Sequence, residues 1–193
     1  MSQENVEVVR GVRYRISLPS EKAGLRRSLD ERLYLRFPAL YRLLAERMAR
    51  LPPRSRLRRL MLTRLAGRSL AAVNRRDFEA FFLAFDPGIE YYPAGDQLPP
   101  GMDAVSHGHD GYEKLWRQMI DSFEDFHAEP EELLDLGEWF FFTIRYGGHG
   151  SGSGVPIKLP LFQLFKVERG VIVWQKDFND RSEALEAAGL SDG

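Results

Sequence analysis

A short polar run in the middle of the chain has residue types and spacing that could support chemistry. His107-Gly108-His109-Asp110 places two imidazoles one residue apart, where on a strand they would share a face and could bind a metal with a carboxylate. The chain offers no second cluster of ligands, and Asp110 suits the first turn of a helix. We therefore predict no metal site. His107 alone is the preferred general acid or base, because an imidazole titrates near neutral pH.

A second candidate lies at the end of the last expected strand. Asp177 could act as a base if its carboxyl group faces inward. Trp174 and Lys176 share one parity on this strand and Asp177 has the other. An inward Trp174 therefore turns Asp177 away unless a bulge intervenes, and Asp177 ranks behind His107.

The sequence lacks the residues of several common kinds of site. It contains no cysteine, which excludes disulfides, thiolate nucleophiles and iron–sulfur clusters. The glycine-rich residues 147–154 lack the lysine of a phosphate loop, and their Gly-x-Ser-x-Gly precedes a strand rather than the helix of a hydrolase elbow. No apolar run approaches the about 20 residues of a membrane span. With no secretory signal pattern at the N-terminus, we expect a soluble cytoplasmic protein without a cofactor.

Hydrophobic periodicity predicts the elements that must position these residues. Apolar residues three or four apart predict helices over residues 21–51, 55–73, 78–85 and 111–126, with Pro38 kinking the first or starting a second helix. The period then changes to two, which predicts strands over residues 128–136, 138–146, 155–168 and 171–178, after a short strand at 89–92. This order predicts an α+β fold with a curved, mostly antiparallel sheet wrapped on N-terminal helices.

The net charge of −1 is the sum of two unlike halves. Residues 1–70 contain 17 basic and 6 acidic residues, whereas residues 71–193 contain 10 and 22. Most of the arginines occupy helix faces that the leucine stripes leave free. The simplest arrangement brings the halves together, so the arginines should contact carboxylates of residues 71–193, within one chain or across a dimer. Arginines that point into solvent would instead favour a membrane or protein partner.

Four segments of the later part of the chain carry a family resemblance. They are SLAAVNRRDFEAFFLAFDPGIEYYP, HGHDGYEKLWRQMIDSFEDF, FFFTIRYGGHGSGSGV and FQLFKVERGVIVWQKDFNDRSEALEAAGL. Together they resemble the SnoaL-like branch of the nuclear transport factor 2-like superfamily. The resemblance implies a cone: a strongly bent mixed sheet around a cavity, closed by N-terminal helices and commonly dimeric. It divides the chain into a helical segment over residues 1–68, with an Arg-rich insertion, and a cone domain over residues 69–193.

The resemblance also implies where one known chemistry would lie. Ketosteroid isomerases of this superfamily use a carboxylate base just after the first strand and a second, protonated acid. Those positions hold Tyr92 and Gln163 here, and neither replaces a carboxyl group, so this activity is not expected. The same alignment turns Tyr92 rather than Tyr91 inward and makes His109 the N-cap of the next helix.

A cone of this kind predicts an aromatic cavity. The expected lining residues alternate on the inner faces of the strands or come from the helix over residues 111–126: Trp116, Phe140, Phe142, Tyr146, Leu161, Gln163, Phe165 and Trp174. This lining suits a small hydrophobic ligand, or it simply fills the cone. If the domain is an enzyme, we expect lyase, cyclase or isomerase chemistry without a cofactor, with Tyr92, His107 and Asp177 as candidate catalytic groups.

The Arg-rich segment leaves three interpretations open. It could be an amphipathic lid packed on the domain or on a dimer partner. It could contact an anionic membrane surface peripherally through residues 21–66. Nucleic acid is the least favoured partner and is not expected, because the aromatic residues follow the apolar stripe and the rest of the domain is acidic. The two functional hypotheses are therefore a small-molecule site in the cone and a non-catalytic interaction module.

Overall fold

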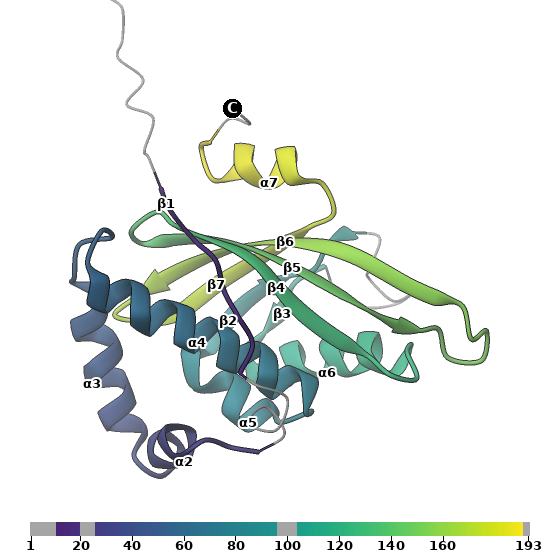
Figure 1. Ribbon diagram of the computed structural model, residues 1–193, viewed down its shortest axis with the longest axis horizontal. Helices are drawn as coiled ribbons and strands as arrows, with labels where there is room; N and C mark the ends of the chain where they lie inside the picture. The colour runs from purple at the N-terminus through teal and green to yellow at the C-terminus, as the bar shows by residue number, and fades with distance from the viewer. Residues whose placement is uncertain (1–10, 20–25, 96–103, 191–193) are drawn as a thin grey trace, which may run out of the picture.

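A strongly curved seven-stranded sheet forms the centre of the computed structural model, which describes residues 11–19, 26–95 and 104–190 (Figure 1). The strand order is β1-β4-β5-β6-β7-β2-β3, in which β2 and β7 are parallel and all other neighbours are antiparallel. The strands are β1 (Val12–Tyr14), β2 (Phe85–Tyr92), β3 (Ser106–His107), β4 (His127–Asp135), β5 (Trp139–His149), β6 (Pro156–Glu168) and β7 (Val171–Phe178). The predicted α+β fold with a mixed curved sheet is confirmed.

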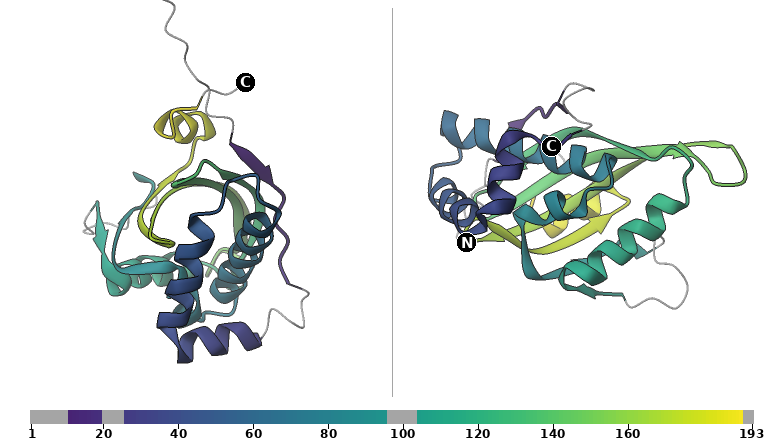
Figure 2. Two further views of the ribbon diagram at one scale, coloured as in Figure 1. Left: turned by 90° about the vertical axis from the view of Figure 1, so that its left-hand side faces the viewer. Right: turned by 90° about the horizontal axis from the view of Figure 1, so that it is seen from below.

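Helices cover both faces of this sheet. They are α2 (Leu29–Arg36), α3 (Pro38–Ala49), α4 (Arg56–Asn74), α5 (Phe78–Phe81) with the 3₁₀ turn η1 (Phe82–Ala84), α6 (Gly108–Asp121) and α7 (Arg181–Ala187). The sheet curves around α3 and α4, with α5 and α6 on the same side, whereas α7 lies on the convex face (Figures 1 and 2). The sheet and the helices on its concave face therefore enclose the interior of the cone.

The N-terminal helices begin and end where capping residues and prolines allow. Ser28 and Glu31 form a reciprocal capping box at the start of α2. Pro38 occupies the first turn of α3, where its missing N–H is not needed, so it starts a second helix. Ser55 caps α4 after the turn at Pro52 and Pro53. The predicted helices over residues 21–51 and 55–73 are confirmed from Leu29 onward, and residues 20–25 lie outside the described ranges.

The strands follow the predicted period of two, with local departures. Arg169 and Gly170 both have positive φ (49° and 82°), the backbone of a tight type I′ hairpin turn between β6 and β7. Strand β4 keeps its place despite Pro130 because the register shifts between Pro130 and Glu132. Strand β1, only three residues long, was not predicted, since so short a run shows no period.

One hydrophobic core joins the N-terminal segment to the cone. It contains Tyr14 and Ile16 near β1, Met48 of α3 and Leu62 of α4, together with the inward residues of the sheet. Gly67 of α4 lets the Ser17 carbonyl approach so closely that a Cβ would lie 2.5 Å from the oxygen. Gly170 likewise admits the backbone of α3, since a Cβ there would meet Ala45 at 2.3 Å.

The predicted contact between the basic and acidic halves is confirmed for only some of the arginines. Arg27 pairs with Asp77 and Glu79, Arg13 pairs with Glu132, and Arg58 pairs with Asp135. Several other arginines of α2, α3 and α4 are exposed and pair with no described carboxylate: Arg32, Arg36, Arg42, Arg47, Arg56 and Arg59. Among the described helices, none is long and apolar enough to cross a bilayer.

Candidate functional site

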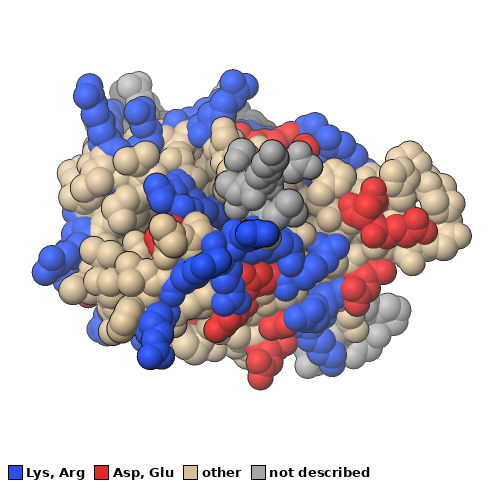
Figure 3. All heavy atoms as spheres, turned by 60° about the horizontal axis from the view of Figure 1, so that its bottom comes forward, with Lys and Arg blue, Asp and Glu red and all other residues tan. Residues whose placement is uncertain are grey.

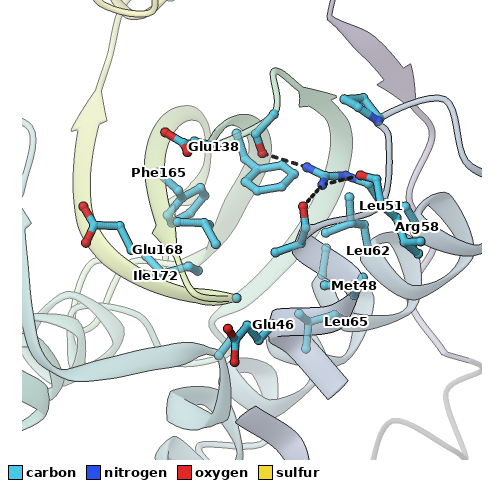
Figure 4. A pocket seen from close by; sticks show the side chains of 18 of the residues that line it. Glu46, Met48, Leu51, Arg58, Leu62, Leu65, Glu138, Phe165, Glu168 and Ile172 are labelled. Carbon is cyan, nitrogen blue, oxygen red and sulfur yellow. Dashed lines mark hydrogen bonds between the residues drawn. The ribbon is translucent and has the colours of Figure 1, made fainter. Parts of the chain in front are cut away.

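A cavity of about 750 Å³ lies between the α3–α4 hairpin and the concave face of the sheet. Figure 4 shows Met48, Leu62 and Leu65 of the helices facing Phe165 and Ile172 of the sheet across it. The remaining apolar wall comes from the connection between α3 and α4, from the rest of α4 and from the strands: Leu51, Pro52, Pro53, Ala66, Ala84, Phe85, Leu133, Phe140, Phe142 and Val167. The volume falls in the range of pockets for drug-sized ligands.

The charged side chains that line the cavity differ in burial: most lie at its edge, and one is buried in its wall. Glu46 of α3, Glu138 before β5 and Glu168 at the end of β6 line it together with Arg50 and Arg169, and all of them except Glu46 are exposed. Glu46 is bonded to Arg50 at 2.6 Å and Glu168 to Lys166 at 2.7 Å. A ligand in the cavity would therefore meet an apolar interior and a charged rim.

Arg58 is the one buried charge of this cavity wall within the described residues. Its five N–H donors are all used: Nε and Nη2 bond the Asp135 carboxylate at 2.7 and 2.8 Å, Nη2 also bonds the Gly137 carbonyl, and Nη1 bonds the carbonyls of Ala49 and Leu51. Arg58 thereby ties the α3–α4 connection to the end of β4. No donor is left for a ligand, so Arg58 positions the cavity wall.

The other end of the cone is filled with aromatic side chains. Tyr112 and Trp116 of α6 are stacked at 6.3 Å, Tyr91 packs on Tyr112 at 4.2 Å, and Trp116 meets Phe126 edge-on. Tyr146 packs on Phe126 in turn. Trp116, Tyr146 and Leu161 are therefore buried as predicted, but they do not line the cavity.

A buried polar cluster lies in this filled end. Asp177 accepts hydrogen bonds from the Tyr91 hydroxyl at 2.8 Å, Gln163 Nε2 at 3.1 Å and Gln175 Nε2 at 2.7 Å. Tyr112 donates to Gln175 Oε1 at 2.7 Å. Burial raises the pKa of Asp177 to about 6, and the hydrogen bonds from Gln175, Tyr91 and Gln163 limit the rise. Burial, and then the charge of Asp177, also raises the pKa of Tyr91 and Tyr112 well above the ordinary tyrosine value.

Two of the predicted orientations are wrong, and one irregularity of β7 explains part of this. Tyr91 faces the interior, whereas Tyr92 packs against Trp174 on the outer face, with ring centroids 5.6 Å apart. Opposite β7, Lys166 pairs with Trp174 and Val167 with Ile172, so Val173 is an extra residue in the strand. This bulge leaves Ile172 and Asp177 inside but turns Trp174 outward, where it packs on Trp139.

The predicted histidine site is placed at the edge of the sheet. His107 is exposed and is the N-cap residue of α6, without a side-chain cap, so the prediction of His109 for that position is wrong. His109 stacks on Phe82 at 4.3 Å instead, and Asp110 lies in the first turn as predicted. His107 is not among the residues that line the cavity.

About half of the cavity wall was missed because it comes from the N-terminal helices. Of the predicted lining residues, Phe140, Phe142 and Phe165 do line the cavity. The opposite wall, from Met48 to Ser69, belongs to the Arg-rich helices, for which packing on the domain was one of three open interpretations and no lining residue was predicted. A usable signal was present in α4, where Arg58 shares a helix face with Leu62, Leu65 and Ser69 through steps of four, three and four residues. An arginine on an otherwise apolar stripe indicates a buried, paired charge.

The chain belongs to the SnoaL-like domain family, which matches residues 66–175. No curated protein matches it in sequence. A nuclear transport factor 2-like protein from Burkholderia pseudomallei has a similar solved structure, with TM-score 0.54, 21% identity, and coverage of 67% of this chain and 96% of that one. IdmH from Streptomyces antibioticus, a proposed polyketide cyclase, gives TM-score 0.54, 17% identity and coverage of 66% and 98%. TerC, co-crystallised with polyporic acid, gives TM-score 0.54, 17% identity and coverage of 61% and 89%.

The family match divides the cavity wall into two parts. The family match begins at residue 66, near the middle of α4, so the sheet wall of the cavity lies inside the family domain. The wall from Glu46 to Leu65 lies before it. About a third of the chain is not covered by the similar structures.

Proposed function

We propose that this protein binds a small apolar molecule in the cavity between α3–α4 and the concave sheet. The observation that carries the proposal is a space of about 750 Å³ whose interior is lined by leucine, methionine, phenylalanine and isoleucine side chains. An empty apolar space of this size would forfeit the contacts that a close-packed interior makes, and an apolar ligand restores them. TerC, which shares the fold, was co-crystallised with polyporic acid, and this supports a small-molecule ligand here.

The wall before residue 66 lies outside the part of the chain that matches the family. Met48, Leu62 and Leu65 form an apolar wall at the open end of the cone. Arg58, whose N–H donors are all bonded, holds the α3–α4 hairpin in place. The charged rim of Glu138, Glu168 and Arg169 leaves room for one polar group of the ligand at the mouth. The ligand class is therefore a mostly apolar molecule with a polar end.

Titration with the neutral fluorescent dye Nile red tests the proposal. Wild type should bind one equivalent saturably, and Ala66→Phe, which places a ring inside the cavity, should weaken binding at least about tenfold. Ala188→Phe is the matched control, because Ala188 packs on the outer face of the sheet near α7. Equal binding by both variants and wild type would show that the dye does not use this cavity and would contradict the proposal.

Proton transfer is a second candidate function, and the buried carboxyl group of Asp177 favours it. Gln163 pairs with the cavity residue Phe142 across β5 and β6 and donates a hydrogen bond to Asp177, which links the cluster to the cavity wall. A pKa of about 6 suits a general base near neutral pH. Deuterium exchange at the carbon next to the carbonyl of 2-acetylnaphthalene, followed by NMR, should then be accelerated by wild type and not by Asp177→Asn. Equal rates with and without protein would eliminate this role.

A further inference from the structure

Apolar side chains stand exposed on the N-terminal helices to an extent that packing does not explain. Leu29 is 84% exposed and Leu60 is 63% exposed. Seven large apolar side chains are exposed on α2, on α3, at the junction between them and on the first turns of α4: Leu29, Leu33, Phe37, Leu40, Leu43, Leu57 and Leu60. The other large apolar side chains that are exposed in the described ranges are Val155 and Leu159, at the distant β5–β6 hairpin. A concentration of this kind marks an interaction surface.

Arginines lie among these apolar side chains without acidic partners. Residues 26–70 contain 13 arginines and only three acidic residues, and no lysine. Each of the three carboxylates is already paired: Asp30 with Arg64 and Arg68, Glu31 with Arg75, and Glu46 with Arg50. Figure 3 shows Lys and Arg side chains spread over uncharged surface on the left of the molecule, where α2 and α3 lie, with little acidic surface between them.

We propose that this surface docks on an anionic lipid bilayer. The surface, here named the α2–α4 outer face, consists of the seven apolar residues above and the exposed Arg32, Arg36, Arg42, Arg47, Arg56 and Arg59. A bilayer surface offers partners to both kinds of side chain. Leucine and phenylalanine enter the boundary between headgroups and acyl chains, and guanidinium groups bond lipid phosphates. Arginine attraction to an anionic leaflet acts over about a Debye length and is weakened by salt.

Other occupants leave part of the α2–α4 outer face unsatisfied. A second copy of the same face would bring unpaired arginines against arginines. A nucleic acid would neutralise the arginines but leave seven apolar side chains without a partner, and Phe37 is the only aromatic residue among them that could stack on a base. An acidic amphipathic helix of another protein would contact only part of the face, because the apolar residues are spread over three helices rather than lining one groove.

Co-sedimentation of the full-length chain with vesicles tests the proposal. Wild type should sediment with phosphatidylcholine–phosphatidylserine vesicles in a 7:3 ratio at low salt, and much less with phosphatidylcholine alone or at high salt. The variant with Arg32→Gln, Arg36→Gln, Arg42→Gln and Arg47→Gln should bind about 100-fold more weakly, since each surface arginine contributes about a fivefold gain before screening. The matched control removes four lysines from the cone (Lys114→Gln, Lys158→Gln, Lys166→Gln and Lys176→Gln) and should keep the wild-type affinity.

A second variant separates docking from attraction by charge alone. Leu33→Ser, Phe37→Ser, Leu40→Ser and Leu43→Ser leave every arginine in place and remove exposed side chains only, so the fold should be kept. Binding to the acidic vesicles should fall at least about tenfold, because the apolar contact is lost. Unchanged binding would contradict the proposed insertion of the α2–α4 outer face.

Three further results would overturn the proposal. Wild type could fail to sediment with acidic vesicles at low salt, or the lysine control could lose as much affinity as the arginine variant. Concentration-dependent dimerisation that the serine variant abolishes, measured by sedimentation velocity, would assign the face to a second copy instead. Nile red binding in the cavity serves as a fold control for each variant, since none of the substituted residues lines the cavity.

Discussion

The two ends of the cone share one concave sheet and differ in what closes them. At the filled end, α6 contributes Tyr112, Leu115 and Trp116, which stack against one another and on the strands. At the open end, Met48, Leu62 and Leu65 of the α3–α4 hairpin face the sheet across a space of about 750 Å³ that they leave unfilled. The same sheet is therefore filled by stacked aromatic side chains of a helix at one end and stays hollow where the aliphatic side chains of a hairpin face it at the other.

The buried charges of the two ends also differ. At the open end Arg58 and Asp135 form a pair that is fully hydrogen bonded and almost inaccessible. At the filled end Asp177 has only neutral donors around it, and its pKa rises because no cation offsets its burial. The Arg58–Asp135 pair therefore holds the α3–α4 connection on the sheet, whereas Asp177 can gain or lose a proton near neutral pH.

The largest effect should follow from breaking the pair at the open end. Arg58→Met leaves the Asp135 carboxylate buried without its cation and three carbonyl groups without donors, which should cost about 3–5 kcal/mol of unfolding free energy. Urea denaturation measures this cost. The double variant Arg58→Met/Asp135→Leu should be more stable than the single variant; an equal or lower stability would mean that the unpaired Asp135 carboxylate is not the cause of the loss.

Truncation of an aromatic side chain should separate the filled end from the open end. Trp116→Ala should cost about 3–5 kcal/mol, because it opens a new void in a packed region. Phe165→Ala should cost at least about 1 kcal/mol less, since one side of that ring already faces the cavity. Denaturation curves compare the two, and Nile red binding should survive Trp116→Ala but weaken with Phe165→Ala. The reverse pattern of dye binding would place the ligand at the filled end.

The stability of the filled end should depend on pH through Asp177. Its pKa in the folded state, about 6, lies above the ordinary value of 3.8, so the folded state binds the proton more tightly than the unfolded state. This contribution is fully present below pH 3.8 and is lost as the pH rises through 6. The difference in unfolding free energy between wild type and Asp177→Asn should therefore shift by about 2 kcal/mol against wild type from pH 4 to pH 7. A difference that does not vary with pH would show that Asp177 keeps an ordinary pKa.

A smaller effect is expected where α3 meets the sheet. Gly170→Ala puts a Cβ on the backbone of Ala45 in a residue with φ of 82°, so the helix must move or the turn must strain. We expect a loss of about 1–3 kcal/mol and weaker Nile red binding. Gly189→Ala is the matched control, because Gly189 also has positive φ but meets no neighbour. Equal losses for the two variants would show that the approach of α3 is not the cause.

Much of the fold could be predicted from periodicity and family resemblance. The helices of the N-terminal segment, the meander from β4 to β7, and the turn at Arg169-Gly170 all have local signals in the sequence. The aromatic residues Phe140, Phe142 and Phe165 were placed on the inner face by the alternation of the strands, and they are there. These features depend on interactions between residues close in sequence, which is why a single sequence reveals them.

The site could be predicted only in part, for reasons of long-range packing. The bulge at Val173 has no local signature, yet it decides that Asp177 faces inward and Trp174 outward. Tyr91 rather than Tyr92 faces inward, and its hydroxyl bonds Asp177, a residue 86 positions away. The position of the α3–α4 hairpin depends on Arg58 and Asp135, which are 77 positions apart. Hydrophobic patterns give the face of each element but do not give its partner.

The position of a bound ligand shows which end of the cone is hollow. Crystals of the protein soaked with 2-bromonaphthalene should show an anomalous bromine peak between Leu65 of α4 and Phe165 of β6, in the cavity at the open end. Ala66→Phe crystals treated in the same way should lose the peak. A peak beside Trp116 and Tyr112 at the filled end, with the open end unoccupied, would show that the cavity at the open end is not the ligand site.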